Sequence, residues 1–145
     1  MSTETSSNAL WRLNESFPSV SGAGESCFDA VCEQLESRAW SAGDVFAMRL
    51  ALSEAFENAV EHGNKRDPSK SVHLSVELDD ARAIASVRDE GPGFPVENAP
   101  DPTLEANLEK VSGRGLFLIR NFMTNVWHNK EGNVIYMEKE KKSEE

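Results

Sequence analysis

The chain has 145 residues, 39% of them hydrophobic and 28% charged, which is typical of one soluble globular domain with one core. Its formal net charge of −10 argues against non-specific nucleic-acid binding and docking on an anionic membrane, although backbone amides can still bind phosphate. No apolar run approaches the roughly 20 residues of a membrane helix, and residues 1–8 lack the features of a signal peptide. We therefore expect a cytoplasmic protein with a disordered tail at 1–8 and a charged tail at 140–145.

Hydrophobic periodicity predicts an alternation of strands and helices between these tails. The expected elements are a strand within 9–20, helices over 24–39 and 41–63, a hairpin of strands 71–78 and 81–89, a helix from 113 to 123, and a hairpin of strands 125–128 and 133–138. Because hairpins and helices are segregated along the chain, we expect an α+β fold, a two-layer α/β sandwich whose mixed sheet carries helices on one face. Trp40 and Trp127 are expected in the core.

The helix predicted over 41–63 has the clearest pattern. Ser41 is placed to cap its first turn, with Asp44 three residues on to favour the positive end of the helix dipole. Gly63 is placed to end the helix in a left-handed turn. The apolar residues that follow helical spacing are Val45, Met48, Leu52, Ala55, Phe56, Ala59 and Val60. They predict one buried stripe along this helix.

Two polar residues, Glu54 and Asn58, lie one helical turn apart at the edge of that stripe. A carboxylate and an amide beside apolar neighbours require an explanation, because burying them without partners is costly. They are either a solvated carboxylate and a satisfied amide, or they serve chemistry. In the second case Asn58 offers a neutral oxygen to Mg²⁺, and Glu54 can act as a general base toward a hydroxyl or a water.

Two glycine-containing clusters fall at the ends of predicted elements. Asp89, Gly91 and Gly93 follow a strand, and Gly113 and Gly115 precede a helix. Each cluster alone is compatible with an ordinary turn. Glycine lets the backbone approach a ligand closely, a helix N-terminus offers N–H groups to a polyphosphate, and Asp89 can accept a hydrogen bond from an amine such as that of adenine. Together with the helix pair, the clusters predict a phosphoryl-transfer site without a Walker lysine.

Three stretches resemble, in this order, the N, G1 and G2 boxes of the Bergerat-fold (GHKL) ATPase superfamily. They are LALSEAFENAVEHGN (50–64), VRDEGPGF (87–94) and DPTLEANLEKVSGRGLFLIRNFM (101–123). Within that superfamily the chain resembles the bacterial anti-sigma-factor serine/threonine kinases from Trp11 to Lys139. The resemblance implies the Bergerat (histidine-kinase-like ATPase) fold, with a single ATP-binding kinase domain over 9–139 and an ATP lid at 95–112.

The resemblance also implies a role for each matching residue. Glu54 would be the general base that prepares a serine hydroxyl of a partner protein, Asn58 would hold Mg²⁺ against the ATP phosphates, and Asp89 would read the adenine amino group. Gly91 and Gly93 would shape the adenine pocket. The residues implied to meet the phosphates, largely through backbone N–H groups at the helix N-terminus, are Gly113, Arg114, Gly115, Leu116 and Phe117.

The leading hypothesis is therefore a kinase that uses ATP and Mg²⁺, binds a sigma factor and phosphorylates a serine on an anti-sigma-factor antagonist. The resemblance further implies a homodimer, and we expect no direct contact with nucleic acid or membrane. One alternative is a non-catalytic module that holds ATP or ADP and acts by protein sequestration. Another, a detached ATP-hydrolysing domain of a larger machine, is disfavoured because we expect no transducer domain after residue 139.

Overall fold

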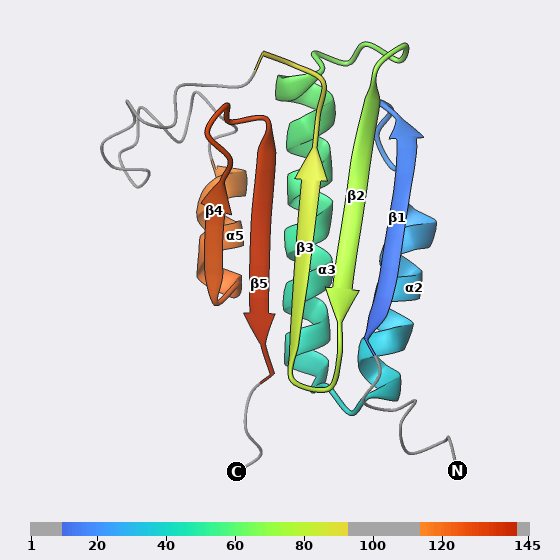
Figure 1. Cartoon of the computed structure of the whole chain (residues 1–145), viewed down its shortest axis with the longest axis vertical. Helices are drawn as coiled ribbons and strands as arrows, with labels where there is room; N and C mark the ends of the chain where they lie inside the picture. Colours follow the sequence, from blue (N-terminus) through green and yellow to red (C-terminus); the bar gives the residue numbers. More distant parts are fainter. Residues whose placement is uncertain (1–9, 93–113, 142–145) are drawn as a thin grey trace.

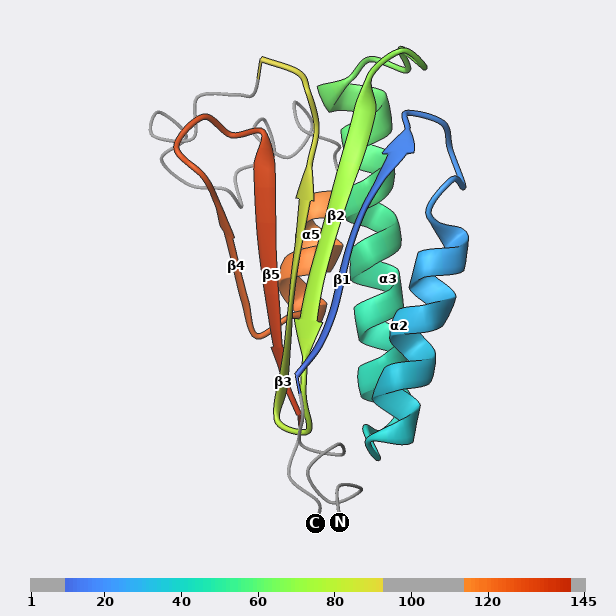
Figure 2. The same cartoon turned by 45° about the vertical axis from the view of Figure 1, so that its right-hand side comes forward.

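The structure is a computed structural model that describes residues 10–92 and 114–141. Its elements are β1 (Trp11–Pro18), α2 (Glu25–Ser37), α3 (Ala42–Asn58), the π-helix η1 (Ala59–Gly63), β2 (Ser71–Leu78), β3 (Arg82–Arg88), α5 (Arg114–Phe122), β4 (Asn125–His128) and β5 (Val134–Glu140). Figures 1 and 2 show the helices on one face of a single sheet, which confirms the α+β two-layer fold. No helix within these described ranges has the length and apolarity to cross a membrane.

The sheet has the strand order β1-β2-β3-β5-β4. Every pair among these strands is antiparallel, so the expectation of a mixed sheet was wrong for the described part of the chain. The reason lies in the connections. The chain passes through α2 and then back through α3 between β1 and β2, so it re-enters the sheet in the direction opposite to β1 (Figure 2). Tight turns join β2 to β3 and β4 to β5, which also forces antiparallel pairing.

The core lies between the sheet and the helices. The alternating residues of β2 and the predicted stripe of α3 both turn inward, and their side chains are buried. The largest fully buried side chains include Phe28, Leu35, Met48, Leu52, Phe56, Leu74 and Leu78. Each such side chain contributes about 1.5–3 kcal/mol through removal from water. The predicted N-cap also forms, because the Asp44 N–H donates to Ser41 Oγ at 3.1 Å. This packing fixes α3 across the sheet and so fixes where its C-terminal end lies.

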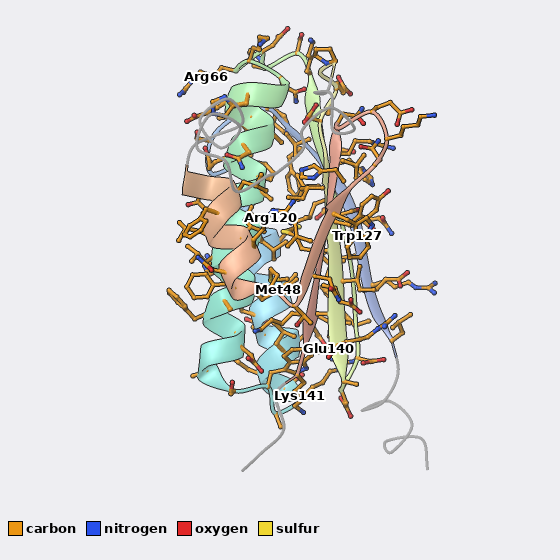
Figure 3. The ribbon with its side chains drawn as sticks, turned by 90° about the vertical axis from the view of Figure 1, so that its left-hand side faces the viewer. Met48, Arg66, Arg120, Trp127, Glu140 and Lys141 are labelled. Atoms are coloured by element: carbon orange, nitrogen blue, oxygen red, sulfur yellow. The ribbon has the colours of Figure 1, made fainter. Side chains whose placement is uncertain are left out.

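The two tryptophans expected in the core differ in their surroundings. Trp40 is buried, and its indole N–H donates to the Asp79 carbonyl at 3.2 Å. Trp127 is 43% exposed, so its expected core position was wrong. It stacks on Tyr136 with a ring-centroid distance of 5.4 Å, on the face of the sheet away from the helices (Figure 3). The register of β4 explains this, because Trp127 lies opposite Tyr136 while its neighbour Val126 packs toward the core.

Candidate nucleotide site

The C-terminal end of α3 departs from the predicted ending. Gly63 does not adopt a positive φ, so the left-handed turn expected there was wrong. Instead α3 continues into the π-helix η1, in which the Asn64 N–H donates to the Ala59 carbonyl at 2.8 Å. The left-handed residues come later, at Lys65 (φ 54°) and Arg66 (φ 61°). A π-turn of this kind often occurs at functional sites.

Gly63 is required for a different reason, which is close approach to the turn after β3. A Cβ atom at Gly63 would lie 2.2 Å from both Cγ and Oδ2 of Asp89. A Cβ atom at Gly91 would lie 2.0 Å from the Gly63 carbonyl oxygen. Both distances are far below van der Waals contact, so only glycine fits at either position. The end of the α3–η1 helix and the turn after β3 therefore touch, at the upper end of the molecule in Figure 1.

Asp89 is the titratable group at this contact. Its backbone N–H donates to the Asn133 carbonyl at 3.0 Å, and its Oδ1 accepts the Gly91 N–H at 2.8 Å. Burial raises the pKa of the Asp89 carboxyl, while the Gly91 hydrogen bond and the charge of Lys70 act in the opposite direction. A carboxylate has about four acceptor positions, so Asp89 retains capacity for a donor from a ligand. It is the type of group that can read an exocyclic amine.

Glu54 and Asn58 lie on consecutive turns of α3, and both are half-buried. Of the residues in 10–92 and 114–141, none forms a hydrogen bond or ion pair with either side chain. Glu57 on the same helix differs, because it accepts from Ser21 Oγ at 2.7 Å and from the Gly22 N–H at 3.2 Å. Among the described residues, the side chains of Glu54 and Asn58 are thus left without a partner, next to a carboxylate that has a structural role.

The donor set fits Mg²⁺ bound chiefly by a substrate. The described residues contain no group of three or more His, Cys, Asp or Glu that could hold a metal ion. Mg²⁺ commonly uses only one or two protein ligands and takes the rest from phosphate oxygens and water. The available amide oxygen of Asn58 is a ligand of that kind. An all-protein metal cage is therefore absent among these residues, whereas a phosphate-bridged ion is compatible with them.

The helix expected to meet phosphates is α5, which packs against α3. It begins at Arg114, so its first backbone N–H groups have no acceptor within the helix. Within this first turn, the side chain of Leu116 is buried, whereas that of Phe117 is exposed. Outside the described part of the chain lie Gly93, Gly113, the expected lid at 95–112 and the side chain of Arg114.

Asn64 is a residue of this site to which the sequence assigned no role. It is fully buried. Its Nδ2 donates to Ser19 Oγ at 3.2 Å and to the Ser71 carbonyl at 2.9 Å, and its Oδ1 accepts the Glu90 N–H at 2.7 Å. The partners fix the orientation of the amide, because a carbonyl only accepts and an N–H only donates. An asparagine after a helix-ending glycine looks like an ordinary cap in sequence, so no local signal indicated these contacts.

Together, the five-stranded sheet, the helices on one of its faces and the contact between the helix end and the turn after β3 match the Bergerat type of ATPase fold. Comparisons with known proteins agree. The histidine kinase-like ATPase domain family matches residues 26–139. The anti-sigma F factor of Geobacillus stearothermophilus is 35% identical over 132 residues, covering 87% of this chain and 84% of that protein. The anti-sigma F factor of Bacillus licheniformis is 34% identical over 116 residues, covering 78% and 73% respectively. The chain therefore belongs to the histidine kinase-like ATPase family, among the anti-sigma-factor serine/threonine kinases.

Proposed function

We propose that this chain is an ATP-dependent serine/threonine kinase that binds a sigma factor and phosphorylates a serine on an anti-sigma-factor antagonist. The observation that carries the proposal is the contact between Gly63 at the helix end and Asp89 and Gly91 in the turn, because it joins a catalytic helix to an adenine-reading carboxylate. The name of the relatives, anti-sigma F factor, supports the sigma-factor partner. The kinase domain spans 9–139, with the lid at 95–112.

ATP is the substrate whose chemistry the described residues suit. The carboxylate of Asp89 accepts the exocyclic amine of adenine, and Gly91 with Gly93 shapes the pocket around the base. The phosphates extend toward the first turn of α5. The residues that meet them, mainly through backbone N–H groups, are Gly113, Arg114, Gly115, Leu116 and Phe117. A helix N-terminus carries a partial positive charge, which favours a polyphosphate there.

Mg²⁺ is the ion we expect beside Asn58. The chain has a net charge of −10 and places Glu54 one turn from Asn58, so a bare triphosphate would meet an unfavourable field. When bound, Mg²⁺ would supply charge neutralisation at the ATP phosphates. The Asn58 amide oxygen would hold the ion without adding further negative charge beside Glu54.

The transfer step uses Glu54 as the general base. The hydroxyl oxygen of the antagonist serine attacks the γ-phosphorus of ATP, and the bond between that phosphorus and the β,γ-bridging oxygen breaks. Glu54 accepts the hydroxyl proton, so the products are phosphoserine, ADP and a protonated carboxyl that later releases its proton to water. Proper positioning of the serine beside Glu54 requires the docked antagonist, so the free kinase hydrolyses ATP slowly.

As a cytoplasmic homodimer, the proposed kinase would act in two ways, by binding the sigma factor and by phosphorylating the antagonist. The unphosphorylated antagonist competes with the sigma factor for the kinase, and phosphorylation releases the antagonist so that the sigma factor is held again. Glu54 has no side-chain partner among the residues that the structure describes, and this supports a catalytic protein over a purely sequestering one, because a module that only held nucleotide would need no such carboxylate at the edge of its core.

Sigma-factor binding gives the direct test of the partner assignment. Each sigma factor of the source organism is purified and titrated onto the immobilised chain in Mg-ATP. We expect one of them to form a saturable complex with a dissociation constant of about 1 μM or tighter. An unrelated protein of equal size and net charge serves as the control for non-specific attraction. If no sigma factor binds to a chain that does bind ATP, the sigma-factor assignment is wrong.

A further inference from the structure

We propose that Asn64 is the positioning residue of the adenine site. Its side-chain amide holds the Glu90 N–H, and through Glu90 it holds the turn that carries Asp89. Asn64 thereby sets both the affinity for ATP and the preference for adenine over guanine, without touching the nucleotide. The inference rests on the proposed adenine-reading role of Asp89, which it extends to a residue that directs the carboxylate.

The turn is held by three consecutive backbone N–H groups with three different acceptors. The Asp89 N–H donates to the Asn133 carbonyl, which ties the turn to the hairpin of β4 and β5. The Gly91 N–H donates to Asp89 Oδ1, which closes the turn on itself. The Glu90 N–H donates to Asn64 Oδ1 at 2.7 Å. Among these three bonds, only the one to Asn64 ties the turn to the end of the α3–η1 helix.

The opposite side of the Asn64 amide is fixed to the scaffold. Its Nδ2 donates to Ser19 just after β1 and to the Ser71 carbonyl at the start of β2. The Ser19 N–H in turn donates to the Lys70 carbonyl at 3.1 Å, so this anchor is part of the sheet edge. The amide is fully buried and cannot exchange these partners for water. Asn64 therefore holds the turn in a fixed position relative to the sheet and the helix, rather than capping the helix alone.

Gly63 and Gly91 make this connection necessary. Their backbones approach closely, and that contact is only steric, since a Cβ at Gly91 would lie 2.0 Å from the Gly63 oxygen. Steric contact sets a minimum separation, whereas the hydrogen bond to Glu90 supplies the attraction that keeps the turn against the helix. Without it the turn can move away from Gly63, and Asp89 moves with it. A displacement of a binding group by about 1 Å can weaken the interaction that it makes by a large factor.

Base selectivity depends on the same placement. Adenine presents an exocyclic amine, a donor, where guanine presents a carbonyl oxygen, an acceptor. A fixed carboxylate at Asp89 accepts from the amine and repels the carbonyl oxygen, so it favours ATP over GTP. A carboxylate that has moved away makes neither interaction well. Loss of the Asn64 bond therefore reduces ATP affinity more than GTP affinity.

The test measures ATP and GTP dissociation constants by calorimetry in Mg²⁺, together with melting temperature, for wild type and Asn64→Ala. We expect Asn64→Ala to weaken ATP binding by about tenfold or more and to reduce the ATP/GTP preference by a similar factor. Ser19→Ala is the matched control, because it removes an Nδ2 partner and leaves the bond to Glu90 in place. It should lower the melting temperature while ATP affinity and selectivity stay at wild-type values.

Asn64→Asp is the second variant and serves if Asn64→Ala does not fold. It keeps an acceptor for the Glu90 N–H, so it should retain most of the ATP preference even though a buried charge lowers its melting temperature. Wild-type ATP affinity and selectivity in folded Asn64→Ala would overturn the inference and leave Asn64 with a structural role. Loss of the ATP preference in folded Asn64→Asp, or in Ser19→Ala, would overturn it also, because both variants keep an acceptor for the Glu90 N–H. If wild type itself fails to bind ATP, the proposed function fails first, and the inference with it.

Discussion

A Glu54→Gln variant is expected to lose phosphoryl transfer to the antagonist by about 10²- to 10⁴-fold, the usual contribution of a positioned general base. Glutamine keeps the size and polarity of the side chain but cannot accept the serine proton. Because no described residue depends on Glu54 for a hydrogen bond or ion pair, the fold and ATP affinity should stay at wild-type values. Transfer is measured as radiolabel that passes from the γ-phosphate of ATP to protein-bound phosphoserine.

Glu57→Gln is the matched control for this prediction. Glu57 lies on the same helix, but its carboxylate accepts from Ser21 and from the Gly22 N–H, so it is committed to the loop between β1 and α2. The control should keep full transfer with a modest loss of stability. Retained transfer in Glu54→Gln would remove Glu54 from the mechanism. A wild type that binds ATP and the sigma factor yet transfers no phosphate to a bound antagonist would favour the non-catalytic sequestering module.

A Gly63→Ala variant is expected to weaken ATP binding by about 100-fold or more, since its methyl group would lie 2.2 Å from the Asp89 carboxylate. Backbone and a half-buried side chain meet at this point, so one segment has to move. Overpacking of this kind costs about 1–3 kcal/mol, and the turn after β3 is the segment with less packing to lose. The measurement is calorimetric titration with Mg-ATP, with circular dichroism as the check that the helices and sheet remain.

Gly43→Ala provides the comparison at a permissive glycine. Gly43 lies in the first turn of α3, and the nearest atom to an added Cβ is Ser41 Oγ at 3.9 Å. Alanine in a helix is favoured over glycine by about 0.5–1 kcal/mol, so this variant should be more stable than wild type and bind ATP equally well. If Gly63→Ala also binds ATP like wild type, the helix end and the turn do not form the nucleotide site.

Features with a local pattern were predictable from the sequence. The alternation of Val72, Leu74, Val76 and Leu78 predicted a half-buried strand, and the structure buries these four residues in β2. The stripe of α3 and the Ser41 cap were confirmed in the same way. These predictions succeed because a strand or helix with one buried face repeats its apolar residues at a fixed period. Glu54 was predictable as a candidate for a related reason, because it is a polar residue at the edge of that apolar stripe.

Features that depend on distant contacts were not predictable. Asn64 and Glu90 are 26 residues apart, and only the packing of η1 against the turn after β3 brings them together. The requirement for glycine at position 63 was interpreted as a left-handed turn, although the structure shows that it comes from Asp89. Trp127 was expected in the core from the general burial tendency of tryptophan, whereas strand register places it on the open face. In each case a tertiary contact decided the outcome, and local periodicity carries no information about it.

Calorimetric titration of Mg-ATP into wild type and Asp89→Asn tests the central claim most directly. Burial raises the pKa of the Asp89 carboxyl, so folding disfavours its ionised form. The protonated carboxyl therefore contributes stability below its ordinary pKa of 3.8, and this contribution is lost as the pH rises through the raised pKa of the folded state. The uncharged asparagine should therefore not lower stability at neutral pH. We expect one ATP per chain in wild type and about 10- to 100-fold weaker binding in the variant, as for the loss of a hydrogen bond to a charged group. Absence of ATP binding by the folded wild type, or equal binding by Asp89→Asn, would contradict the account.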